Sequence, residues 1–210
     1  MRVVAGTARG RRIVAPPGLD VRPTLDRVRQ AIFNALDARG VVEDARVIDV
    51  FAGSGALGIE ALSRGAATVT FVEHDRKSLA CIKENLDALG FTGQATIVRS
   101  DVVAWSAWRI PEADLILVDP PYTFAGWTPL LERLLVSLTP TQGIAVLETA
   151  RPITLPATWE VVREQKYGGT VVTFAVPAIV DLADPESPEP FDTSGSVPDT
   201  QVPPSVPDPD

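Results

Sequence analysis

Residues 46–58 read Arg-Val-Ile-Asp-Val-Phe-Ala-Gly-Ser-Gly-Ala-Leu-Gly, and this stretch decides the fold. Its apolar, largely β-branched first half predicts a buried strand. The glycines at 53, 55 and 58 match the GxGxxG spacing, in which a tight turn leads from a strand into a helix. Because glycine has no Cβ, the backbone of this turn can approach a ligand closely. The stretch therefore predicts a strand, a ligand-binding glycine loop and a helix in succession.

Apolar runs and helical stretches alternate over the rest of the chain. Five such runs predict βα units on a parallel sheet. Two further runs, 159–166 and 170–176, are joined by three residues, too few for a parallel crossover, and predict an antiparallel hairpin. We expect an α/β, Rossmann-like sheet of seven strands, mostly parallel, with an antiparallel C-terminal hairpin, an arrangement that resembles the class I methyltransferases. The five runs are 46–51, 68–73, 95–99, 114–119 and 143–148, and the helical stretches lie near 57–64, 76–89 and 128–138.

The first 23 residues predict a small basic arm. Two short extended runs, Arg2–Ala5 and Arg12–Ala15, flank a glycine-bracketed turn and predict a β-hairpin that contributes little to the core. From Thr24 onward, apolar residues recur at helical spacing, and Gly40 can end the helix. The main domain is therefore expected over residues 24–177.

The formal charge of −8 is unevenly distributed along the chain. Residues 178–210 contain eight acids, eight of the 19 prolines and no lysine or arginine, which predicts a disordered acidic tail. This leaves 19 acids against 19 basic residues in the remainder. Within that remainder, residues 1–29 contain seven arginines and two aspartates, a composition that favours contact with nucleic-acid phosphates.

The composition excludes several functional classes. The chain of 210 residues is 45% hydrophobic and 22% charged, and no apolar run is long enough to cross a membrane or to form a signal peptide. We therefore expect a cytoplasmic protein, a monomer without membrane contact. The single cysteine, Cys81, and the single histidine, His74, exclude an internal disulfide and a thiolate or imidazole metal site, so no metal is expected.

Acidic residues accompany the first three predicted strands. Asp49, in the strand before the glycine loop, would repel a pyrophosphate but attract the positively charged methionyl amine of S-adenosylmethionine. Glu73, at the end of the second strand, can hold a ribose diol. Asp101 can accept from the adenine amino group with Val102 against the ring, or it can cap the helix that begins near Val102. The expected cofactor is S-adenosylmethionine, and the loop residues expected to bind it are Phe51, Ala52, Gly53, Ser54 and Gly55.

The fourth predicted strand ends in Asp119-Pro120-Pro121-Tyr122, the most specific signal in the chain. Two successive prolines stiffen the turn and remove two N–H donors, which leaves acceptors exposed. The Asp119 carboxylate and the Pro120 carbonyl can hold the N–H groups of an exocyclic nucleobase amine, which is a poor nucleophile without such orientation. Tyr122 offers a flat face on which an extruded base can stack. We therefore predict Asp119, Pro120 and Tyr122 as catalytic residues.

Four motif groups between residues 2 and 176 carry a more specific resemblance. They are Val4-Ala5-Gly6 with Arg9-Gly10-Arg11, Arg22-Pro23-Thr24 with Asp26-Arg27-Val28-Arg29, Phe51–Gly58 continued by Glu60–Gly65, and Asp119–Tyr122. Together they resemble the RsmD-type 16S ribosomal RNA guanine-N2 methyltransferases. The resemblance implies methyl transfer to the N2 amine of a guanine in 16S rRNA, with an assembled or assembling small subunit as partner.

The resemblance also extends the expected site. It implies that the segment from Arg22 to Arg29 closes over cofactor and RNA, which adds Thr24 to the cofactor-binding residues. The residues expected to contact RNA are Arg9, Arg11, Arg12, Arg22, Arg27 and Tyr122. Tyr122 stands where many members of the family have phenylalanine, which keeps the stacking face.

Three other functions compete with this interpretation. An N6-adenine methyltransferase acting on DNA or RNA would use the same Asp119–Tyr122 chemistry, and only the amino-terminal motifs argue against it. A nicotinamide-dependent dehydrogenase is disfavoured by Asp49 and by the closing hairpin. A cofactor-less RNA-binding module would explain the basic arm but not the acids at the strand ends.

Overall fold

The computed structural model describes residues 1–16, 23–107, 110–140 and 142–178, with only the backbone of 23–25. The predicted helix from Thr24 is present and begins at Pro23, and Gly40 follows its end with φ 67°. The strands are β1 (Arg46–Val50), β2 (Thr68–Glu73), β3 (Ala95–Arg99), β4 (Leu115–Val118), β5 (Ile144–Thr149), β6 (Trp159–Tyr167) and β7 (Thr170–Pro177). The helices are α1 (Pro23–Asp37), α2 (Ala56–Ser63), α3 (Arg76–Leu89), α4 (Val102–Ser106) and α5 (Trp127–Leu135), with a 3₁₀ turn, η1 (Thr92–Gln94).

The seven strands form one sheet in the order β3-β2-β1-β4-β5-β7-β6 within the described residues. The pairs β1–β2, β1–β4, β2–β3 and β4–β5 are parallel. Strand β7 pairs antiparallel with both β5 and β6. The predicted mostly parallel sheet with an antiparallel C-terminal hairpin is therefore confirmed.

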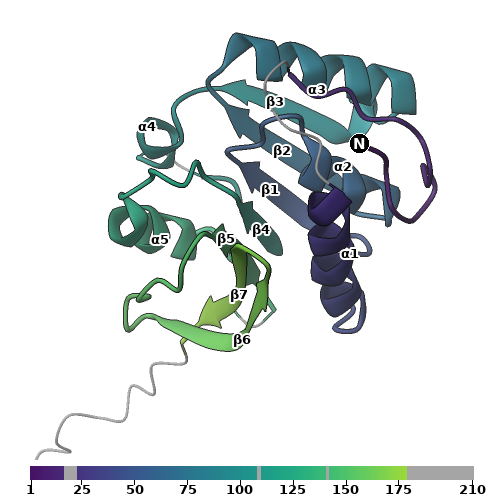
Figure 1. Cartoon of the computed structure of the whole chain (residues 1–210). Helices are drawn as coiled ribbons and strands as arrows, with labels where there is room; N and C mark the ends of the chain where they lie inside the picture. Colours follow the sequence, from purple (N-terminus) through teal and green to yellow (C-terminus); the bar gives the residue numbers. More distant parts are fainter. Residues whose placement is uncertain (17–22, 108–109, 141, 179–210) are drawn as a thin grey trace, which may run out of the picture. The chain divides into compact units, whose positions relative to one another are not determined.

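Helices cover both faces of the sheet (Figure 1). Side chains alternate between the two faces along each strand, so each strand serves two cores. In β4, Leu117 packs with residues of α1, α2 and α3, whereas Ile116 and Val118 pack with residues of α4 and α5. The strands thus lie between two helical layers, and the carboxyl ends of the parallel strands lie beside one another.

The amino-terminal arm folds differently from the prediction. Instead of a β-hairpin of two extended runs, it forms an isolated antiparallel bridge between Arg2 and Arg12. The backbone of Val3 and Gly10 closes the turn, because the Gly10 N–H donates to the Val3 carbonyl at 2.9 Å. The pairing is therefore antiparallel as expected, but it does not extend into strands.

The prediction that this arm contributes little to the core is wrong. Val3, Ala8 and Ile13 are all buried in the core on the α1–α3 side. The carboxylate of Glu60 in α2 is fully buried and accepts from the backbone N–H groups of residues 4 and 5 at 2.8 and 2.9 Å. A buried carboxylate requires such partners, so the arm and α2 stabilise one another.

Two predicted features lie outside the described residues: Arg22 and the acidic tail from residue 179 onward. The contacts within the chain define Met1–Ile179 as one compact unit. None of the helices in the described residues is long and apolar enough to cross a membrane.

Candidate active site at the carboxyl ends of the strands

The glycine loop between β1 and α2 needs its glycines for two reasons. Gly53 and Gly55 have φ of 55° and 77°, the left-handed region that glycine adopts without strain. At Gly58, an added Cβ would lie 2.4 Å from Cε1 of Phe71, so glycine permits α2 to pack closely on β2. Phe51 also has a positive φ of 61°, which is uncommon for a bulky residue and is found at functional sites.

Asp49 lies beneath this loop with 1% of its surface exposed. Its Oδ2 accepts from the N–H of Gly58 at 2.9 Å, which ties the start of α2 to β1. Burial, opposed by this hydrogen bond, raises the pKa of Asp49 to about 7, with further contributions from the nearby charges of Asp119 and Glu73. The side chain therefore has a structural partner, and its predicted contact with the methionyl amine stays a prediction.

Glu73 joins the glycine loop to the turn after β2. Its Oε2 accepts from the Gly53 N–H, and its Oε1 accepts from the N–H groups of His74 and Asp75, each at 2.8 Å. A carboxylate has about four lone-pair sites, so roughly one remains for a ribose hydroxyl. Asp75 in turn caps α3 by accepting from Ser78.

Four acids converge on one face of the sheet. Asp49, Glu73 and Glu148 each come two positions after a residue that packs against the α1–α3 layer, namely Val47, Phe71 and Val146. Side chains two positions apart on a strand share a face, so the three carboxyl groups point to the same side. Asp119 follows directly after β4, whose Val118 pairs with Leu147 of β5, and it therefore neighbours Glu148.

Asp119 is exposed to solvent. The surrounding protein nevertheless raises the pKa of Asp119 to about 6, because neighbouring atoms displace much of the water that would stabilise its charge. Among the described residues, neither its carboxylate nor the Pro120 carbonyl takes part in a hydrogen bond, whereas the Pro121 carbonyl accepts from the Phe124 N–H at 2.8 Å. These two acceptors are therefore without a protein partner in the described part of the chain, and their contact with a substrate amine stays a prediction.

A pocket of about 320 Å³ opens beside this turn. Its volume lies in the range of about 300–1,000 Å³ that small-molecule sites occupy. Tyr122 at its edge is 70% exposed, which leaves an open aromatic face. Phe51 of the glycine loop contacts Phe124 edge-on at 5.1 Å between ring centroids, and Phe124 contacts Trp127 at 5.4 Å. The pocket is lined by Pro120, Pro121, Tyr122, Phe124, Trp127 and the segment from Glu148 to Ile153.

Glu148 is the site residue that the sequence interpretation missed. It lines the pocket, yet only 8% of its surface is exposed. Burial raises the pKa of Glu148 well above its usual value; the charges of Asp119 and Asp49 raise it further, and Arg29 of α1 lowers it. Glu148 ends an apolar run just as Asp119 follows one, and this parallel was the available signal.

Three predicted cofactor residues are already engaged in the protein. Ser54 is buried, and its carbonyl accepts from the Asn85 amide at 3.1 Å. Asp101 caps α4 by accepting from the Ala104 N–H at 3.0 Å, the alternative role that the sequence left open. Val102 is 2% exposed inside the α4–α5 core, so it offers little surface to an adenine ring. Ala52 is buried too, whereas no side-chain contact of Thr24 is described.

The structure does not bring the predicted RNA-binding arginines of the arm, Arg9, Arg11 and Arg12, together with Asp119, and Arg22 lies outside the described residues. The arm packs on the carboxyl ends of α2 and α3, where Thr7 donates to Ser63 and Arg11 donates to the Ala88 carbonyl at 2.6 Å. These helices run opposite to the strands, so this surface lies away from the Asp119-Pro120 turn. Arg9 and Arg12 are exposed there, and Arg27 is exposed on α1.

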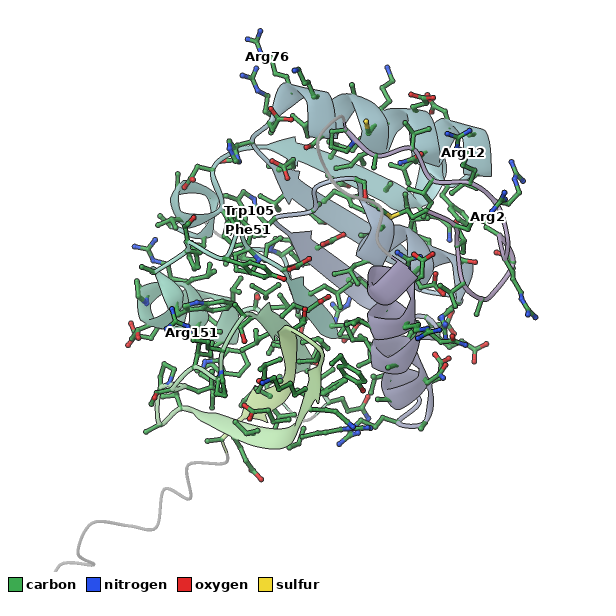
Figure 2. All side chains as sticks on the ribbon, in the orientation of Figure 1. Arg2, Arg12, Phe51, Arg76, Trp105 and Arg151 are labelled. Atoms are coloured by element: carbon green, nitrogen blue, oxygen red, sulfur yellow. The ribbon has the colours of Figure 1, made fainter. Side chains whose placement is uncertain are left out.

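Arg151 is an exposed cation that the sequence interpretation did not select. It lines the pocket beside Tyr122. Figure 2 shows Arg12 and Arg151 on opposite sides of the view. A basic side chain therefore lies at the pocket itself, separate from the basic arm. No cluster of potential metal ligands is present within the described ranges.

Comparisons with known proteins agree with this geometry. The family model described as "Conserved hypothetical protein 95" matches residues 1–176. Ribosomal RNA small subunit methyltransferase D of Escherichia coli K12 is 37% identical over 177 residues, covering 80% of this chain and 85% of that protein. The Bacillus subtilis protein YlbH is 36% identical over 179 residues, which cover 82% of this chain and 96% of that protein. The solved structure of yhhF from Escherichia coli has a TM-score of 0.75 and 34% identity, covering 84% of this chain and 97% of that chain. The chain therefore belongs to the RsmD-type family of ribosomal RNA small subunit methyltransferases, with the class I methyltransferase fold.

Proposed function

We propose that this protein transfers a methyl group from S-adenosylmethionine to the exocyclic N2 amine of a guanine in 16S rRNA of the small subunit. One observation carries the proposal. The rigid Asp119-Pro120 turn presents two unused acceptors beside both the glycine loop and an aromatic pocket. Relatives named as small-subunit rRNA methyltransferases support rRNA as the substrate.

The residues around the glycine loop fit S-adenosylmethionine better than a dinucleotide. Asp49 and Asp119 lie close enough at this end of the sheet that each negative charge disfavours the other. A ligand with a positive sulfonium and amine relieves this repulsion, whereas a pyrophosphate would increase it. When bound, S-adenosylmethionine supplies an electrophilic methyl group. Glu73 and the Gly53–Gly55 turn would hold its ribose and methionyl parts.

Asp119 is proposed to orient the amine. Its carboxylate and the Pro120 carbonyl each accept one N–H of the amine, which directs the nitrogen lone pair toward the methyl carbon. The methyl carbon would bond to that nitrogen as its bond to sulfur breaks, and the Asp119 carboxylate would stabilise the positive charge that develops on the nitrogen. The amine then loses one proton, which the Asp119 carboxylate can accept because its pKa is raised to about 6.

Tyr122 and Arg151 are proposed to hold the extruded nucleotide. Tyr122 provides an open ring on which the base can stack, a contact worth about 1–3 kcal/mol per base. Arg151 can pair with a phosphate at the same pocket. Arg9 and Arg12 lie on another surface, so any RNA contact there involves a distant part of the rRNA. Because basic side chains lie both at the pocket and on the distant arm, a large folded RNA in an assembled or assembling subunit can contact both surfaces, whereas a short strand cannot. We further propose that the protein acts as a cytoplasmic monomer.

The experiment that tests this function is a methyl-transfer assay with labelled S-adenosylmethionine. Naked 16S rRNA, small subunits from cells lacking the enzyme, and duplex DNA serve as separate substrates. We expect N2-methylguanine in digests of the ribosomal substrates, at one position, with wild-type protein and not with Asp119→Ala. Methylation of DNA adenine without any guanine product would overturn the proposal.

A further inference from the structure

Glu148 is a buried acid without a partner in the described structure. Its exposed fraction of 8% makes it more than nine-tenths buried, and its carboxylate takes part in no hydrogen bond or ion pair within the described residues. Leaving a carboxylate desolvated and unpaired is unfavourable. Glu148 also lines the pocket, so part of its remaining exposed surface faces that cavity. This arrangement points to a ligand that donates hydrogen bonds.

The position of Glu148 indicates which part of a ligand it meets. Val118 and Leu147 are paired across β4 and β5, so Asp119 and Glu148 are neighbours in the sheet. The two side chains lie close enough for their charges to interact. A base whose amine is held by Asp119 and Pro120 therefore presents the adjoining edge of its ring to Glu148.

We propose that Glu148 determines guanine specificity by accepting the N1–H of the target base. This inference rests on the proposed function. Guanine carries two donor groups side by side, N1–H and the N2 amine, which match two adjacent carboxylates. Adenine has an acceptor at N1, so it would leave an unpaired lone pair facing Glu148. The donated hydrogen bond favours the ionised form of the acid, which strengthens the discrimination.

The first test uses chemically altered rRNA and unaltered protein. The target guanine is replaced by 2-aminopurine, which keeps the amine at C2 but has no hydrogen on N1. Sites built to bond a substrate N–H can reject an analogue that lacks it by factors of up to about 10⁴–10⁵. We expect kcat/KM to fall at least about 100-fold with 2-aminopurine. A fall of less than about threefold would overturn the inference, whatever the behaviour of any variant.

The second test uses Glu148→Gln, which keeps the size of the side chain but adds an amide donor. The Gln amide can donate to the bare N1 of 2-aminopurine. We expect kcat/KM for guanine to fall about 10- to 100-fold and the preference for guanine over 2-aminopurine to fall at least tenfold. If Glu148 has only a structural role, the substitution will lower kcat/KM equally for guanine and 2-aminopurine. An unchanged preference between the two bases would therefore refute the assignment.

Glu160→Gln is the matched control, because Glu160 is an exposed acid on β6 outside the pocket. Glu160→Gln should leave kcat/KM unchanged for both the guanine and the 2-aminopurine substrates. Calorimetry should show that Glu148→Gln binds S-adenosylmethionine within about threefold of wild type. If wild-type protein methylates no guanine in 16S rRNA, the proposed function itself fails; if it does and the base preference does not depend on Glu148, only this inference fails.

Discussion

Asp49→Asn should alter the pH dependence of folding. In the wild type, burial raises the pKa of Asp49 from its ordinary value of 3.8 to about 7. Between these two values the folded protein holds a proton that the unfolded chain releases, so folding stability falls as pH rises through this window. Asparagine keeps an acceptor for the Gly58 N–H but cannot ionise. The variant therefore lacks this loss of stability at high pH.

The size of the effect follows from the pKa values. A pKa raised from 3.8 to about 7 corresponds to a cost of about 4 kcal/mol for the ionised form in the folded protein. The unpaired amide N–H groups of the asparagine cost about 1–3 kcal/mol at every pH. We therefore expect Asp49→Asn to be less stable than wild type near pH 4 and more stable near pH 8, with the difference changing by about 4 kcal/mol.

Urea unfolding at intervals between pH 4 and pH 8 measures this difference. Asp114→Asn is the control, because the pKa of Asp114 is shifted in the opposite direction. The hydrogen bond from Arg46 lowers it, so Asp114 is ionised in both the folded and the unfolded protein above pH 4. That variant should be less stable than wild type by a nearly constant amount over the same range. A constant difference for Asp49→Asn as well would refute the reasoning, since Asp49 would then ionise alike in the folded and unfolded states.

Three further predictions concern catalysis, packing and RNA binding. Asp119→Asn should lower kcat at least about 100-fold in the methyl-transfer assay and leave calorimetric S-adenosylmethionine affinity within about tenfold, since its carboxylate acts on the amine; turnover near wild type would remove Asp119 from the mechanism. Gly58→Ala should destabilise the protein by about 1–3 kcal/mol in urea unfolding, because the new Cβ collides with the Phe71 ring, and unchanged stability would contradict the described packing. Arg9→Ala with Arg12→Ala should flatten the salt dependence of rRNA binding by up to about 0.7–0.9 units of log K per log salt for each lost phosphate contact, whereas an unchanged slope would show that neither arginine contacts RNA.

The sequence predicted the elements well, because periodicity reports local burial. Alternating apolar runs with glycine turns between them located all seven strands. The three-residue connection after β6 required an antiparallel hairpin, because no parallel crossover is that short. The acceptors of the Asp119-Pro120 turn were also predictable, because proline removes N–H donors regardless of its surroundings.

Tertiary structure decided which polar groups are already paired. Glu73, Asp101 and Ser54 looked like ligand contacts in the sequence, yet each makes hydrogen bonds to distant or neighbouring backbone groups. Such pairings depend on how loops meet in space, and a local pattern does not contain that information. The same reason explains the amino-terminal arm, whose Val3 is buried because the Glu60 carboxylate binds the adjacent backbone.

Glu148 shows most clearly what a sequence pattern cannot predict, namely which groups surround a side chain in the folded protein. In the sequence it is the last residue of an apolar run, a position that it shares with strand ends that face solvent. Only the register of β4 against β5 places it beside Asp119 and buries it in the pocket wall. The sequence by itself determined the sheet, the glycine loop and the Asp119-Pro120 turn, since these follow from local residue chemistry. The neighbours of each carboxylate, and hence its charge and available partners, were decided by strand order and packing between segments far apart in the chain.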